Sequence, residues 1–370
     1  MKKLALTDFT KYRYPSALEL SPDGRYLTFA LKEVDREGDG YRWNLWLYDL
    51  ESRESRQITR GDHQRQAVWE DNTHILYKTT ELDEAMRARG FEEEWTVYHR
   101  LNVCTGEECE AFRLPMSVSG LWKMDEGRYV FTGETHLDRP NLLELTGEAL
   151  EKELVRRQQT KGYKVLTELP LCENGVGMFN QTRITLFLYL EATGEYRRIT
   201  PEDYDVNHVN VRPGQVLFTA FPFRDIKPVT EGMYRWDAER NETETLITPD
   251  KYSIDYVGDY LLSDIGYYYV PDQQLGTIWE HPERLWKASP LTYADRVKTP
   301  TLFIHADKDY RCTLANGLEM FAALKLHGVE SKLCMFYGEN HGLSREGKPS
   351  NRISRLSEIL HWMEEHLKEE

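Results

Sequence analysis

The chain has 370 residues, of which 40% are hydrophobic and 12% aromatic, and this is enough for two domains with substantial cores. Its 62 acidic residues outnumber its 47 Lys and Arg residues, and the formal net charge of -15 argues against a nucleic-acid partner. No apolar run reaches the roughly 18 residues of a membrane helix, and polar residues interrupt the N-terminal segment before a signal sequence forms. We therefore expect a cytoplasmic protein with no membrane partner.

The five cysteines are an odd number without a C-x-x-C pair. This pattern indicates reduced thiols in a cytoplasm rather than a disulfide framework. Cys104 and Cys109 are five positions apart and could pair if the chain were oxidised.

A repeat runs from Leu18 to Asp250, where short β-rich segments alternate with turn residues and three segments end on an Ile-Thr pair. Of their threonines, Thr59 and Thr200 are 141 residues apart, three steps of 47, and Thr248 follows 48 residues later. This period, with about four strands per copy, is typical of the radial sheets of a β-propeller. We count four copies and a fifth that starts over residues 251–260 and stops. The alternative is a β-sandwich, which regularly spaced short strands also allow.

An insertion over residues 136–175 interrupts the third copy. Within it, TGEALEKELVRRQQTKG has Leu150 and Leu154 at helical spacing and ends on Gly162, which predicts a helix. The segment is either a plain surface insertion or a gate over the channel of a propeller.

The C-terminal part of the chain is predicted to be α/β. Its expected elements are a strand over 301–305, a helix over 314–327 ending at Gly328, a strand over 331–337 and a helix over about 352–367. The side chains expected to face the sheet from the last helix are Ile353, Leu356, Leu360, Met363 and Leu367.

Asp309 follows the first of these strands and His341 follows the second. Because the carboxyl ends of parallel strands meet at one sheet edge, we expect the two side chains to share a site. Serine hydrolysis needs an imidazole to take the hydroxyl proton and a carboxylate to fix the imidazole tautomer. The order Asp then His is that of the late part of an α/β-hydrolase, so we predict a catalytic acid and base. The alternative is a structural Asp and an ordinary loop His.

His305, Asp307 and Asp309 form an H-x-D-x-D cluster that could hold a divalent metal. The nearby sequence has no second His or carboxylate-rich loop to complete such a ligand set. We therefore expect neither a metal nor a cofactor.

Two stretches of the chain resemble the prolyl oligopeptidase family of serine peptidases, in its acylaminoacyl-peptidase branch. They are SDIGYYYVPDQQLGTIWEHPERLWKASPLTYADRVKTPTLFIHADKDYRC and GENHGLSREGKPSNRISRLSEILHWMEEHL. The resemblance implies a β-propeller of about four blades plus a fragment over residues 1–260, followed by a partial α/β-hydrolase over residues 261–370. It also implies hydrolysis of short or N-blocked peptides, with Asp309 as the triad acid and His341 as the triad base.

Family members carry the nucleophilic serine in a G-x-S-x-G turn, and no serine of this chain has that pattern. Ser119 has glycine only at the next position, and Ser263 has Leu261 and Ile265 where glycines should stand. The simplest interpretation is an internal deletion that removes three of the family's seven blades and the front of the hydrolase. We therefore expect impaired catalysis. The alternatives are a non-catalytic propeller that binds a peptide or protein, and a truncated remnant.

A hydrolase reduced to two parallel strands would expose an apolar sheet edge. Such an edge invites pairing with another chain, so a homo-oligomer is a further expectation.

Overall fold

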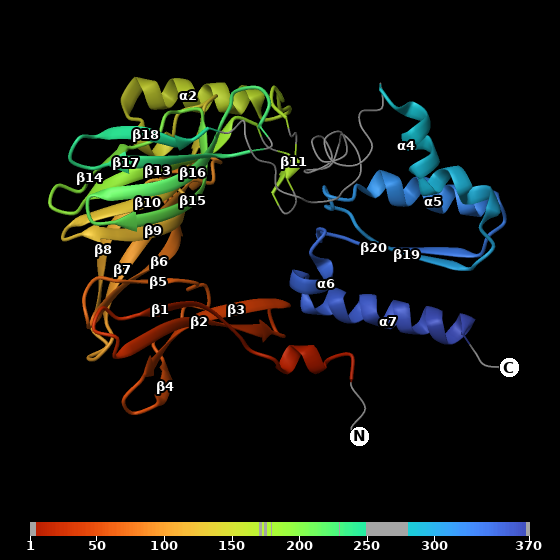
Figure 1. Ribbon diagram of the computed structural model, residues 1–370, viewed down its shortest axis with the longest axis horizontal. Helices are drawn as coiled ribbons and strands as arrows, with labels where there is room; N and C mark the ends of the chain where they lie inside the picture. The colour runs from red at the N-terminus through yellow and green to blue at the C-terminus, as the bar shows by residue number, and fades with distance from the viewer. Residues whose placement is uncertain are drawn as a thin grey trace.

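The computed structural model describes residues 5–169, 172–173, 176–178, 180–228, 230–248 and 280–367. The described part of the first 248 residues contains four antiparallel sheets of four strands each, and residues 280–367 form helices around a pair of parallel strands (Figure 1). The four sheets agree with the four predicted copies. The predicted fifth copy lies outside the described residues.

In sheets 1, 2 and 4 the four strands follow one another in the chain. In sheet 3 an insertion separates the second strand from the third. Sheet 1 contains β1 (Tyr14–Leu20), β2 (Tyr26–Asp35), β3 (Gly40–Asp49) and β4 (Glu54–Gln57). Sheet 2 contains β5 (Ala67–Trp69), β6 (His74–Leu82), β7 (Glu94–Asn102) and β8 (Glu108–Leu114). Sheet 3 contains β9 (Val118–Asp125), β10 (Arg128–His136), β13 (Thr182–Leu190) and β14 (Glu195–Arg198). Sheet 4 contains β15 (Tyr204–Arg212), β16 (Gln215–Pro222), β17 (Gly232–Asp237) and β18 (Glu242–Ile247).

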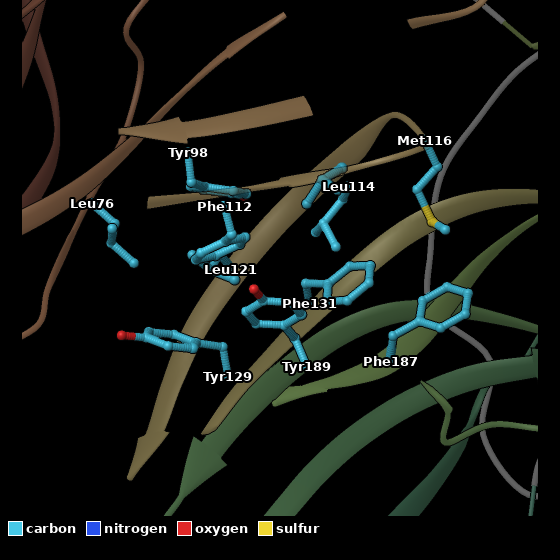
Figure 2. Packing of buried hydrophobic residues seen from close by; sticks show 11 residues of the cluster. Leu76, Tyr98, Phe112, Leu114, Met116, Leu121, Tyr129, Phe131, Phe187 and Tyr189 are labelled. Atoms are coloured by element: carbon cyan, nitrogen blue, oxygen red, sulfur yellow. The ribbon is translucent and has the colours of Figure 1, made fainter. Parts of the chain in front are cut away.

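Apolar side chains fill the space between successive sheets. Figure 2 shows the cluster between sheets 2 and 3, where the rings of Phe112 and Tyr189 stack with centroids 4.3 Å apart. Phe131 and Phe187, both from sheet 3, stack at 5.0 Å in the same cluster. Similar clusters join sheet 1 to sheet 2 and sheet 3 to sheet 4. Because a lone sheet cannot cover both of its faces, each sheet depends on its neighbour for its core.

The repeated Ile-Thr pairs have a common structural role in sheets 1 and 3. Thr59 is 5% exposed and its hydroxyl accepts a hydrogen bond from the Leu45 amide at 2.8 Å. Thr200 is 2% exposed and accepts from the Leu186 amide at 3.2 Å. Each threonine follows the last strand of its sheet and satisfies a buried amide of the third strand, whereas Thr248 is exposed. The 141 residues from Thr59 to Thr200 therefore hold two sheets and the insertion, so the predicted three steps of 47 residues are wrong. The Ile-Thr pairs of sheets 1 and 3 instead reflect a shared need to satisfy a buried backbone donor.

The substitutions Thr59→Val and Thr200→Val are each expected to lower the free energy of unfolding by about 1–3 kcal/mol. Valine keeps the shape but leaves a buried amide without an acceptor. Urea unfolding followed by circular dichroism measures the change, with the exposed Thr243→Val as the matched control. Equal losses in all three variants would contradict this role.

The predicted insertion separates β10 from β13 and contains the predicted helix, α2 (Gly147–Thr160), after the short η2 (Leu142–Glu144). Two short strands, β11 (Cys172–Glu173) and β12 (Gly177–Met178), pair farther along. Leu154 packs with Leu142 and with Met86 of α1 (Glu84–Ala88), so α2 is fixed to the β6–β7 connection. Figure 1 shows α2 at the top of the view, above the strands of sheets 3 and 4.

A buried ion pair fixes the return of this insertion to sheet 3. Arg183 and Glu168 are 0% and 2% exposed and lie 2.5 Å apart. The Arg183 guanidinium also donates to the Phe223 carbonyl at 3.1 Å and lies over the Phe223 ring. Since an unpaired buried charge costs several kcal/mol, these contacts bind the insertion to both sheets 3 and 4.

The C-terminal elements confirm the predicted α/β order. They are α4 (Pro282–Ala288), η4 (Pro290–Arg296), β19 (Thr301–Ala306), α5 (Leu314–Leu326), β20 (Ser331–Phe336), α6 (Leu343–Glu346) and α7 (Pro349–His366). β19 and β20 pair in parallel, and α5 and α7 lie on opposite sides of the pair (Figure 1). A short η1 (Asp8–Lys11) precedes β1 and lies near α7. No described helix is both long enough and apolar enough to cross a membrane.

The predicted face of the last helix is only partly right. Leu360, Met363 and Leu367 are 43%, 47% and 69% exposed, whereas Trp362 is 8% exposed. The Trp362 ring stacks on His366 with centroids 3.9 Å apart, so near its C-terminal end the helix buries a different stripe from the predicted one.

Candidate functional site

The two predicted site residues lie on loops that follow β19 and β20. The strands pair in register from Thr301 with Ser331 to Ala306 with Phe336, so their carboxyl ends are level. Beyond the strands, the Lys308 amide donates to the Glu339 carbonyl at 3.0 Å. A backbone hydrogen bond thus joins the two loops just before Asp309 and His341 in the chain.

Asp309 and His341 are in hydrogen-bond contact. His341 Nδ1 lies 3.1 Å from Asp309 Oδ2, and the two side chains are 33% and 10% exposed. The other carboxylate oxygen, Oδ1, accepts from the backbone amides of Arg311 at 3.0 Å and Cys312 at 2.8 Å. The carboxylate is therefore held by its own loop, and the contact assigns the proton of the neutral imidazole to Nδ1. In this tautomer Nε2 is the basic nitrogen, as proton abstraction requires.

Glu339, which the sequence analysis did not single out, supports the His341 loop. It is 6% exposed, and its Oε1 accepts from the Lys348 amide at 3.0 Å and from Asn351 Nδ2 at 2.7 Å. A Cβ at Gly347 would lie 2.9 Å from Glu339 Oε2, so this glycine leaves room for the carboxylate. The contacts join the His341 loop to the start of α7. No periodicity in the sequence could have identified Glu339, because its partners are set by the loop conformation.

Replacement of Asp309 by Ala is expected to speed hydrogen exchange at the Arg311 and Cys312 amides, because both lose an acceptor. Asp309→Asn keeps the Oδ1 acceptor and is expected to retain most of the protection. Amide exchange followed by NMR compares the two variants. Unchanged protection in the Ala variant would show that the loop does not depend on this side chain.

The metal alternative is not supported by the positions of its residues. A Cβ at Gly317 would lie 2.8 Å from His305 Cδ2, so the His305 ring packs against α5. Asp307 Oδ1 accepts from the Gly338 amide at 2.6 Å on the loop side. Over the described ranges, no three His, Cys, Asp or Glu side chains are grouped as metal ligands would be.

Of the two serines considered as nucleophiles, the structure describes only Ser119. Ser119 lies on β9, where its hydroxyl is 2.8 Å from the Thr132 hydroxyl. Ser263 lies outside the described residues.

A cavity of about 520 Å³ lies at the ends of sheets 2 and 3, beneath the insertion. Its charged lining consists of the carboxylates Glu92, Glu93, Glu94, Glu134 and Glu144 and the guanidinium groups of Arg139, Arg157 and Arg198. His136 also lines it, and its Nε2 accepts from Arg139 at 3.0 Å. Burial, with a smaller effect from Arg139, lowers the pKa of His136 to about 4. The imidazole is therefore neutral at pH 7.

His136→Gln tests this neutral state through the pH dependence of stability. A lowered folded pKa means that the unfolded chain binds the proton first, so wild-type stability falls as the pH drops from about 6.5 to about 4. We expect His136 to contribute up to about 2 kcal/mol to this fall in stability. This is less than the whole pKa shift would correspond to, because 25% of the side chain is exposed to solvent. Urea unfolding at pH 7 and pH 4.5 measures the difference, with the exposed His361→Gln as the control. Identical pH dependence in wild type and His136→Gln would contradict the expectation.

The C-terminal segment matches known peptidases in sequence. Residues 250–370 match the prolyl oligopeptidase family, which confirms the expected resemblance over this segment. The uncharacterized peptidase YuxL of Bacillus subtilis is 43% identical over 106 residues, which cover 29% of this chain and 16% of that protein. The acylamino-acid-releasing enzyme of Arabidopsis thaliana is 36% identical over 89 residues, covering 24% of this chain and 11% of the relative. The matched segment thus spans less than a fifth of either relative.

Solved acylaminoacyl peptidases resemble the whole chain in fold. The Pyrococcus horikoshii enzyme aligns with a TM-score of 0.63 and 13% identity, covering 100% of this chain and 98% of that structure. An acylaminoacyl peptidase in complex with Z-Gly-Gly-Phe-chloromethyl ketone aligns with a TM-score of 0.64 and 13% identity, covering 99% and 98%. At this identity the likeness concerns the fold alone.

Proposed function

We propose that Asp309 and His341 are the acid and base of a serine-peptidase triad of the prolyl oligopeptidase type. The observation that carries the proposal is the contact between His341 Nδ1 and Asp309 Oδ2 at the level ends of two parallel strands. It lies within the segment that matches the family. Serine hydrolysis needs an imidazole that a carboxylate holds in position. Here two backbone amides hold the carboxylate itself.

The proposed reaction is hydrolysis of a peptide bond in short or N-blocked peptides. In such a reaction a serine hydroxyl gives its proton to His341 Nε2 as it attacks the carbonyl, and Asp309 stabilises the imidazolium that forms. The proton then passes to the leaving amine. The peptidyl chloromethyl ketone bound by one structural relative supports a short peptide as the ligand.

We further infer that this chain alone has little activity, because none of its serines stands in a G-x-S-x-G sequence. Loss of one triad member in a serine protease costs about four to six decades of rate. An internal deletion in a longer ancestral sequence accounts for the absence of this turn together with the short sheet around β19 and β20.

The domain arrangement that fits this proposal has two parts. Residues 1–260 form a propeller portion in which sheets 1 to 4 are blades, and residues 261–370 form the C-terminal part of an α/β-hydrolase. Four successive four-stranded sheets, each packed on the next through apolar side chains, support the first part. The parallel strands with a helix on each side support the second.

A fluorophosphonate probe tests the competence of the site, since covalent labelling requires an activated serine. We expect no labelling of the purified chain and no measurable release from an N-acetylated peptide substrate. Labelling that His341→Ala abolishes would refute the inferred impairment and would support the triad. A full-length peptidase of the family serves as the positive control for the probe.

A further inference from the structure

The start of α7 depends on a side chain from the other end of the chain. The first amides of a helix have no partner within the helix, and the N-cap residue, Lys348, provides no side-chain acceptor. Instead, the Ser350 amide donates to Asp39 Oδ1 at 2.9 Å, and the Ser350 hydroxyl donates to Asp39 Oδ2 at 2.5 Å. Asp39 lies 311 residues away, in the turn between β2 and β3. It therefore does what an N-cap carboxylate does, but from sheet 1.

Tyr41 adds a second contact beside the first. Its hydroxyl donates to the Gly347 carbonyl at 3.1 Å and accepts from Arg352 Nη1 at 2.7 Å. The Arg352 guanidinium lies over the Phe9 ring of η1, 4.0 Å from its centroid. Figure 1 shows the tip of the β2–β3 hairpin beside the corner of α6 and α7. Asp39 and Tyr41 thus contact Ser350 and Gly347, which lie on either side of Lys348 in the chain.

These contacts continue to the His341 loop. The Lys348 amide donates to Glu339 Oε1, and the Glu339 carbonyl accepts from the Lys308 amide in the Asp309 loop. Glu339 is two residues before His341 in the chain. A displacement of residues 347–350 would therefore change the position of Glu339 and with it the loop that presents the imidazole.

We propose that the β2–β3 hairpin positions His341, with Asp39 capping α7 and Tyr41 holding Gly347. Asp39 and Tyr41 are positioning residues in this account, and its catalytic meaning rests on the proposed function. The proposal also explains why the proposed function needs sheet 1: its contacts with the start of α7 hold the loop that presents His341.

The charges at the contact agree with this role. A carboxylate is favoured at a helix N-terminus, where the helix dipole is positive. The Ser350 hydroxyl, and after it the Ser350 amide, hold the pKa of Asp39 below its usual range, with a smaller contribution from Lys348. The cap is therefore charged at neutral pH, and its stabilising contribution is lost only as the pH falls below the ordinary range for Asp.

Hydrogen exchange and the NMR signals of the His341 ring test the proposal in the absence of any substrate. Asp39→Ala is expected to speed exchange of the Ser350 amide about tenfold, as loss of a cap of roughly 1.4 kcal/mol implies, and to shift the His341 ring signals. Asp39→Asn is expected to cause smaller changes, since Asn is also a good N-cap. Asp35→Ala is the matched control, because Asp35 accepts from the Glu37 amide within the same hairpin.

The proposal is overturned if Asp39→Ala leaves the His341 signals unchanged, or if Asp35→Ala shifts them equally. Tyr41→Phe is the second variant. It keeps the ring and removes the hydroxyl, and it is expected to shift the same His341 signals, so the proposal stays testable if Asp39→Ala does not fold. Neither readout needs peptidase activity. The NMR experiment can therefore be interpreted even if the chain has no activity. Equally, a negative NMR result would not change the interpretation of the fluorophosphonate experiment.

Discussion

The backbone hydrogen bonds that pair β19 with β20 in register determine where the site lies. Because the strands are parallel and level, the loops after Ala306 and Phe336 leave the sheet side by side. The turn at Asp309 is closed by two backbone amides that donate to its carboxylate, and this turn brings the carboxylate against His341. A slip of one residue in this register would turn every side chain of a strand to the other face and separate the pair.

The remaining structure supports this edge from a distance. Sheets 2 and 3 each pack against two neighbours, and sheets 1 and 4 against one, so the series acts as a continuous frame from sheet 1 to sheet 4. Arg183 and Glu168 bind the long insertion into that frame, where their charges are fully buried and paired. At the other end of the frame, Asp39 and Tyr41 reach the start of α7. Among the described residues, directional contacts from Asp39 and Tyr41 thus connect the frame to the loops of the site.

Local sequence patterns were sufficient to predict much of this arrangement. Short β-rich runs between turn residues gave four copies of about four strands, and Thr59 and Thr200 recur because each satisfies a buried amide. The 47-residue step was wrong because the insertion lengthens the third copy. Asp309 and His341 were found because parallel strands bring the ends of successive strand-loop units together. Asp39 and Glu339 were missed because their partners depend on tertiary contacts, one of them across 311 residues. The exposure of Leu360 and Met363 was missed because periodicity marks an apolar stripe but not which side chains a two-stranded sheet covers.

The central claim is that Asp309 orients His341 so that Nε2 can act as the base, and the ring tautomer tests it most directly. Long-range ¹H–¹⁵N correlation on histidine-labelled protein, recorded at a pH where the ring is neutral, identifies the protonated nitrogen. The account predicts a proton on Nδ1, fixed by the contact with Asp309 Oδ2, and an unprotonated Nε2. A neutral ring with its proton on Nε2 would contradict the account, because such an imidazole could not accept a proton from a serine at that nitrogen.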